Sequence, residues 1–323
     1  MGTMNVIIDF VKKWTLVVAL LVGAAVYLLF SQVPPLEPVG TLVGPKLVAL
    51  LPYVIFVILY VTFCKIQIRE LRPRAWHFIL QGIRTLLSAL CVALVAVAPT
   101  PSLRLVFEGM FICFICPTAA AAPVVTEKLG GSIESMTVYI LIANCVTSVI
   151  IPLFFPMVEK GAGITFLFAF LMVLRRVLMV LVVPLLLALF TRRFLPGVAG
   201  WLRGRRNLAF YLWSFNLSII MGLAVRSILH APVSGATLVA LCVVPLFIAV
   251  FQFGLGKWVG AHFGASVSAG QALGQKNTVV GIWLTLTFLN PYAAIAPCAY
   301  VVWQNIINAV QLWYKQKYGQ LPW

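Results

Sequence analysis

Lys276 is the residue whose type and position carry the most chemical information. It lies inside an apolar stretch, residues 264–290. A charged lysine at membrane depth costs about 2.5–3.5 kcal/mol on insertion scales, so it usually faces a cavity or a partner. Its ammonium would neutralise helix carbonyls or attract an anion. Two alternatives stay open: Lys276 snorkels from a shifted helix end to the membrane surface, or it is desolvated and exchanges protons.

Three further polar residues fall in the same region of the predicted fold. Asn277 and Thr278 follow Lys276 directly, where they would begin a helix whose free N–H groups favour an anion. Ordinary N-capping is an equally good explanation for both. Gln304, in the last apolar stretch, would either reach the same cavity or hydrogen-bond two helices together.

Arg84 and Glu108 are also charges inside apolar stretches. Arg84 lies three residues after Gln81, so the two share one helix face. We expect Arg84 and Glu108 to form a structural ion pair, because a buried charge without a partner is costly. The alternative is that Arg84 contacts a substrate directly.

The sequence predicts no metal site, no cofactor and no catalytic residues. Cys113 and Cys116 have a CxxC spacing, but no second cysteine or histidine pair accompanies them inside this apolar stretch, so they should pack as small hydrophobes. Of the 7 acidic residues only Glu108 lies deep in a stretch, so a converging acid–base set is missing. We therefore expect no enzyme, and keep a membrane-embedded transferase only as a minor alternative.

The elements that must position these residues are membrane helices. The 323 residues are 63% hydrophobic and only 9% charged, whereas soluble domains have about 25% charged residues. A membrane helix needs about 20 apolar residues. Ten apolar stretches meet this need, at about 14–31, 42–64, 75–98, 102–126, 134–158, 162–191, 207–228, 234–256, 264–290 and 292–314. The predicted class is an all-α protein of ten transmembrane helices in a lipid bilayer.

The net charge of +16 is explained mostly by topology, so we expect no nucleic-acid partner. Cytoplasmic loops of membrane proteins are enriched in Lys and Arg. With the N-terminus inside, fifteen basic residues fall in inner loops: Lys12, Lys13, Lys65, Arg69, Arg72, Arg74, Lys128, Arg192, Arg193, Arg203, Arg205, Arg206, Lys257, Lys315 and Lys317. Four fall in outer loops: Lys46, Arg104, Lys160 and Arg226. This predicts a multi-pass protein of the cell (inner) membrane with both termini in the cytoplasm.

The ten stretches divide into two halves of opposite orientation, residues 1–160 and 161–323, each with five helices. This is the arrangement of an inverted repeat. The fourth stretch of each half contains helix-breaking residues, at 117–123 and 272–277, including Pro117, Pro123 and Gly274. Matched interruptions of this kind indicate a transporter binding site.

The chain resembles the bile acid:sodium symporter family over nearly its whole length. Residues 116–124 read Cys-Pro-Thr-Ala-Ala-Ala-Ala-Pro-Val, where the family reads Cys-Pro-Gly-Gly-Thr-Ala-Ser-Asn-Val. Residues 272–278 read Ala-Leu-Gly-Gln-Lys-Asn-Thr, where the family reads Glu-x-Gly-x-Gln-Asn-Ser. Residues 303–306 read Trp-Gln-Asn-Ile, where the family often has Trp-His-Asn-Ile.

The resemblance implies a fold of two parts. Helices 1, 2, 6 and 7 would form a panel, and helices 3, 4, 5, 8, 9 and 10 a core in which the broken helices 4 and 9 cross. A substrate would bind near the crossing, and motion of the two parts would give alternating access. The expected contact residues are Thr118, Ala120, Ala121, Lys276, Asn277, Thr278 and Gln304.

The departures from the family concern its sodium sites. The positions of the family's Ser, Asn, Glu and Gln ligands hold Ala122, Pro123, Ala272 and Lys276. These side chains offer no oxygen, and lysine is itself a cation. We therefore expect Lys276 to replace the sodium charge in a sodium-independent transporter of small organic anions, such as bile acid-like or carboxylate solutes. The alternatives are a sodium-coupled symporter with rebuilt ion sites and, further off, a channel or a receptor.

Overall fold

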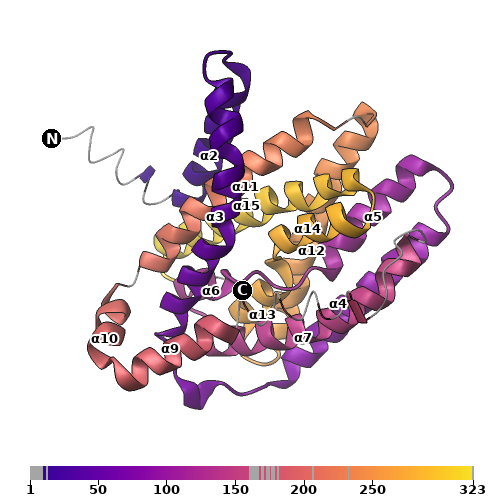
Figure 1. The fold of residues 1–323 in the computed structure, drawn as a ribbon. Helices are drawn as coiled ribbons and strands as arrows, with labels where there is room; N and C mark the ends of the chain where they lie inside the picture. The colour runs from indigo at the N-terminus through magenta and orange to yellow at the C-terminus, as the bar shows by residue number, and fades with distance from the viewer. Residues whose placement is uncertain are drawn as a thin grey trace.

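The computed structural model describes most of the chain. The described residues are 10–11, 14–159, 182–205, 207–231 and 233–321, with the single positions 167, 168, 171, 175 and 179. Apart from one isolated β-bridge, all regular structure in them is helical (Figure 1). The expected all-α class is therefore correct.

Seven of the described helical segments are long and apolar enough to cross a membrane. They are α2 (Thr15–Gln32), α3 (Glu37–Phe63), α4 (Ala75–Ala96), α7 (Ile133–Val158), α11 (Leu208–Leu229), α12 (Gly235–Ala261), and the 3₁₀ turn η3 (Pro291–Ala294) continued by α15 (Ile295–Tyr318). An eighth span results if α9 (Val183–Phe194) and α10 (Pro196–Gly204), which meet at 115°, are counted as one. The chain has the helical architecture of a multi-pass membrane protein, whereas the count of ten spans and the repeat stay predictions.

Two predicted spans are each divided into two shorter helices. The first consists of α5 (Pro101–Ile115) and α6 (Ala122–Leu129), and the second of α13 (Ser266–Gly274) and α14 (Thr278–Phe288). The interruptions are residues 116–121 and 275–277. Residues 272–274, predicted to belong to the second break, are the end of α13. Ala122 and Pro123 belong to α6, because proline is tolerated in the first turn of a helix.

Hydroxyl side chains cap the N-termini of three of these helices. Thr100 accepts a hydrogen bond from the Leu103 N–H (3.2 Å) before α5, and Ser132 accepts one from the Ser135 N–H (3.0 Å) before α7. Ser234 does the same before α12. Such caps satisfy N–H groups that have no partner within the helix.

The loop assignments need correction in several places. Six basic residues assigned to loops lie within helices: Lys46 in α3, Arg104 in α5, Lys128 in α6, Arg226 in α11, and Lys315 and Lys317 in α15. The segment expected as an inner loop after residue 191 is largely helical, because α9 continues to Phe194 and α10 follows. Lys257, counted with the loops, lies inside α12. The expectations for Lys12, Lys13, Lys160 and Arg206 fall outside the described residues, as does half of the sixth stretch.

The helices pack as two groups that meet along α15. α2, α3, α9 and α11 contact one another, and Gly23 allows α2 to approach the backbone of α11 at Ser218. The other group consists of α4, α5, α6, α7, α12, α13, α14 and α15, and Gly256 allows the backbones of α12 and α13 to approach closely. α2 and α11 both contact α15 (Figure 1). The two interrupted segments belong to the second group.

Candidate functional site

The two helix breaks meet and pair through their backbones. Thr118 and Lys276 form an isolated antiparallel bridge. The Ala119 N–H donates to the Gln275 carbonyl (3.0 Å), and the Asn277 N–H donates to the Pro117 carbonyl (2.8 Å). In a membrane interior, backbone groups freed by unwinding must find partners in the protein. Here each break supplies partners to the other, so the crossing stabilises both interruptions.

Lys276 extends from the second break to the end of α5. Its Nζ donates to the Phe114 carbonyl (3.1 Å), and the residue is only 1% exposed. The last carbonyls of a helix have no partner within it and carry a partial negative charge. The neighbouring Cys113 carbonyl accepts a hydrogen bond from Gln252 Nε2 (3.3 Å), on α12. Side chains from other elements therefore satisfy the C-terminus of α5, and one of them is the amine of Lys276.

The last carbonyl groups of α13 also accept hydrogen bonds from side chains of other elements. Thr118 Oγ1, from the first break, donates to the Ala272 carbonyl (2.6 Å). The Tyr300 hydroxyl, from α15, donates to the Gly274 carbonyl (2.6 Å). Each break thus sends a side chain to the helix end that precedes the other break.

Gln304 holds the backbone of Lys276 at this place. Its Oε1 accepts from the Lys276 N–H (2.7 Å), and its Nε2 donates to the Lys276 carbonyl (3.3 Å). The structure therefore shows Gln304 at the crossing as a hydrogen-bonding link between α15 and the second break. This is the second of the two roles considered for it.

Arg84 does not pair with Glu108, so the expected ion pair is wrong. Arg84 Nη2 donates to Thr118 Oγ1 (2.8 Å) and to the Tyr139 hydroxyl (2.7 Å), and its guanidinium lies 5.3 Å from the centre of the Tyr139 ring. Arg84 is 1% exposed, and its Nε and Nη1 have no hydrogen-bond partner within the described chain. Glu108 is bound to Arg104 instead.

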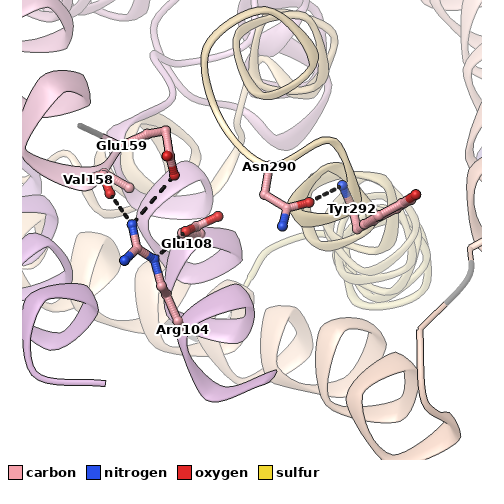
Figure 2. A network of polar contacts seen from close by, with 6 residues as sticks. All are labelled: Arg104, Glu108, Val158, Glu159, Asn290 and Tyr292. Atoms are coloured by element: carbon pink, nitrogen blue, oxygen red, sulfur yellow. Dashed lines mark hydrogen bonds and ion pairs between the residues drawn. The ribbon is translucent and has the colours of Figure 1, made fainter. Parts of the chain in front are cut away.

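Figure 2 shows the separate network that contains Glu108. Arg104 Nε lies 3.1 Å from Glu108 Oε1, one turn along α5. The Arg104 Nη2 also donates to the Val158 carbonyl (2.8 Å) and contacts Glu159 (3.4 Å), which ties α5 to the end of α7. Glu108 pairs with Arg104 because residues four positions apart on one helix lie on the same face. Asn290 and Tyr292 form a turn nearby, in which the Asn290 side chain accepts from the Tyr292 N–H (3.1 Å).

The remaining expected contact residues line the two breaks. Asn277 caps α14, since its Oδ1 accepts from the Val280 N–H (3.3 Å), and Thr278 begins that helix. Ala120 and Ala121 form the buried turn that leads into α6.

The positions expected to bind sodium in the family offer no side-chain oxygen. Ala122 and Pro123 are buried in the first turn of α6, and Ala272 is buried in the last turn of α13. Among the described residues no group of three or more His, Cys, Asp or Glu could hold a metal ion. Lys276 Nζ is hydrogen-bonded to one of the backbone carbonyls at the crossing, that of Phe114.

Three residues of the crossing were missed at the sequence level: Gln252, Tyr139 and Tyr300. The role of Gln252 could have been predicted, because a buried amide inside an apolar stretch must form hydrogen bonds to other helices. The two tyrosines carried a weaker signal, since their rings are compatible with simple packing. Their hydroxyls are recognisable as functional only from the acceptors and donors around them.

A scan of the chain against models of protein families found no match, and a search of curated proteins also found none.

Proposed function

We propose that this protein is a secondary transporter of small organic anions that works by alternating access without a sodium requirement. The proposal follows the resemblance to the bile acid:sodium symporters. It places the protein in the cell membrane with both termini in the cytoplasm. The anion would contact residues of the crossing, with Thr118, Lys276, Asn277 and Gln304 nearest to the paired breaks.

The observation that carries the proposal is a pair of buried basic side chains, Arg84 and Lys276, at the crossing. Neither forms an ion pair with an acidic residue in the described part of the chain. Two nitrogens of Arg84 have no hydrogen-bond partner in the part of the chain that the structure describes. Unpaired charge at membrane depth is costly and typically functional. An anion with two adjacent oxygens, such as a carboxylate or a sulfate, matches the planar fork of an arginine.

The proposed independence from sodium rests on the place of Lys276. A sodium ion about 4 Å from its ammonium would be repelled by about 4 kcal/mol at an effective dielectric constant of 20, or about a thousandfold in affinity. The ammonium binds the Phe114 carbonyl, so it neutralises a helix end that would otherwise attract a metal cation. A proton carried by Lys276 remains an alternative coupling ion.

The packing of the helices in two groups supports alternating access. The group of α2, α3, α9 and α11 touches the crossing group through polar contacts beside α6. Lys65, just after α3, forms an ion pair with Glu127 of α6 (3.1 Å), and Lys128 of α6 bonds to Asn207 at the start of α11. These contacts lie at the end of the protein that the positive-inside rule assigns to the cytoplasm. We interpret them as a closed inner gate.

The test is uptake by the purified protein in liposomes. Labelled taurocholate and labelled pantoate serve as probes of a large and a small organic anion. External sodium is replaced by potassium or choline at constant ionic strength, and a proton gradient is then imposed. We expect saturable uptake of at least one probe at equal rates in the three salts. A clear sodium requirement would instead support the rebuilt symporter.

A variant with Ala272→Glu and Lys276→Gln sharpens this test. It restores two of the family's ligands, but Ala122 and Pro123 still lack side-chain oxygens. We expect the variant to remain without full sodium dependence.

The same assays distinguish the alternative functions. Ion currents far above carrier rates would identify a channel, binding without uptake would identify a receptor, and chemical change of a probe would identify an enzyme.

A further inference from the structure

A groove separate from the crossing opens between α12 and α15. Its volume is about 650 Å³, within the range of about 300–1,000 Å³ typical of ligand pockets. Phe253 and Gly254 of α12 and Ile306 and Val310 of α15 form its apolar walls. Trp258, on its rim, is exposed. In a membrane-spanning protein, this rim faces lipid and not the interior of the protein.

One end of the groove is polar. Lys257, Ser266 and Gln311 come together there from α12, α13 and α15. Gln311 is only 6% exposed, and neither atom of its side-chain amide has a hydrogen-bond partner among the described residues. A buried amide without partners is costly, so this side chain points to a ligand that supplies them.

The other two residues give this end a preference for anions. Lys257 contributes a positive charge, and its aliphatic chain passes closely over Gly270 of α13, where no side chain obstructs it. Ser266 begins α13, and its hydroxyl donates to the Lys257 carbonyl (3.3 Å). The first turn of a helix presents N–H groups and a partial positive charge. None of the residues that line the groove is acidic.

The depth of this polar end matches a lipid headgroup. Lys257 lies four residues before the end of α12, which corresponds to about 6 Å along the helix. Gln311 lies four residues before Lys315, one of the two lysines in the last turn of α15. Both residues therefore lie just inside the membrane boundary, while the apolar walls extend deeper.

We propose that this groove binds one phospholipid with an anionic headgroup. An acyl chain lies along Phe253, Gly254, Ile306 and Val310, and the phosphate binds at Lys257, Ser266 and Gln311. The site is on the outer face of the helix group that contains the crossing, so the lipid is a resident of the bilayer and not a transported solute. The inference does not depend on the proposed transport function.

The test compares two lipids with the same acyl chains, dioleoyl phosphatidylglycerol and dioleoyl phosphatidylcholine. The full-length protein is titrated with each in detergent, and bound lipid is counted by native mass spectrometry. We expect saturable binding of one phosphatidylglycerol, at lower concentration than phosphatidylcholine. Lys257→Met should weaken phosphatidylglycerol binding about fivefold and leave phosphatidylcholine unchanged, because one basic residue contributes about 1 kcal/mol to attraction of anionic lipid.

Gly254→Leu should block the groove and weaken binding of both lipids. A side chain at Gly254 would enter open space, so the helix can accept it. Gly82→Leu is the matched control, because Gly82 on α4 also faces open space and lies away from the groove. Val310→Trp provides a second blocking variant if Gly254→Leu does not give a monodisperse protein.

Three results would overturn the proposal. Equal binding of the two lipids with no effect of Lys257→Met would mean that only bulk lipid surrounds the helix. Full protection of the site by soluble glycerol phosphate would assign it to a free anion. A dimer mass that disappears in Gly254→Leu would identify a second copy of the chain as the occupant.

Discussion

Thr118 and Lys276 pair through their backbones, and each side chain reaches the helix end that precedes the other residue's break. Thr118 Oγ1 donates to the Ala272 carbonyl of α13, and Lys276 Nζ donates to the Phe114 carbonyl of α5. One donor is a hydroxyl and the other is an amine, although each bonds to the helix end before the other break. The two breaks are therefore coupled. A substitution at one break removes a hydrogen bond from the end of the helix that precedes the other.

Lys276→Met should destabilise the protein and weaken anion binding. The variant keeps a long unbranched chain but leaves the buried Phe114 carbonyl without its donor, at a cost of about 1–3 kcal/mol. Thermal unfolding in detergent measures the first effect, and probe binding measures the second. Lys46→Met is the control, because Lys46 is exposed on α3. Unchanged stability and binding in the Lys276 variant would contradict the assigned role.

Thr118→Val should remove the hydrogen bond between Arg84 and the first break. The substitution conserves shape but removes the hydroxyl that accepts from Arg84 and donates to the Ala272 carbonyl. We expect a loss of about 1–3 kcal/mol in stability from the unsatisfied groups. Thr41→Val is the matched control, since Thr41 Oγ1 bonds only locally to the Pro38 carbonyl on an exposed part of α3. Equal unfolding temperatures of the two variants would show that the hydroxyl of Thr118 is dispensable.

Double-mutant cycles should couple Glu108 to Arg104 and not to Arg84. The Arg104 side chain is 43% exposed, while that of Glu108 is 3% exposed. For a partly solvated pair one helix turn apart, we expect a coupling of about 0.5 kcal/mol. The cycle of Arg84→Met with Glu108→Gln should be additive, because separate networks do not interact. A coupling above about 1 kcal/mol between Arg84 and Glu108 would reinstate the pairing that the structure rejects.

Exchange of the charges at Lys65 and Glu127 should leave uptake nearly intact, whereas single reversals should not. Lys65→Glu or Glu127→Lys alone places like charges together and loosens the contact between the segment after α3 and α6. The double variant restores an ion pair of opposite orientation. Modification of a cysteine placed at the crossing, by a reagent added from the cytoplasmic side, reports on opening. We expect faster modification in both single variants, and similar rates in all four proteins would argue against an inner gate.

The sequence alone determined the class of the protein and the places where its helices break. Long apolar stretches have no other stable conformation in a membrane than a helix, because every backbone group must be paired internally. Pro117 lies in the first interruption and Gly274 ends the helix before the second, since such residues weaken a helix, whereas Pro123 and Gly270 are accommodated within α6 and α13. The position of Lys276 at a break could be predicted for the same local reason.

Only the tertiary structure decided which polar groups meet. Arg84 and Glu108 were plausible partners by depth, but the rotation of α4 turns Arg84 toward Thr118 and Tyr139. Gln304 was placed at the crossing by sequence, yet its role as a clamp on the Lys276 backbone depends on the packing of α15 against the second break. The groove at Lys257 and Gln311 is likewise formed only by the packing of α12, α13 and α15. Spacing along a helix determines which residues share a face, whereas the partner of that face depends on helix rotation and crossing, which arise from contacts between segments far apart in the chain.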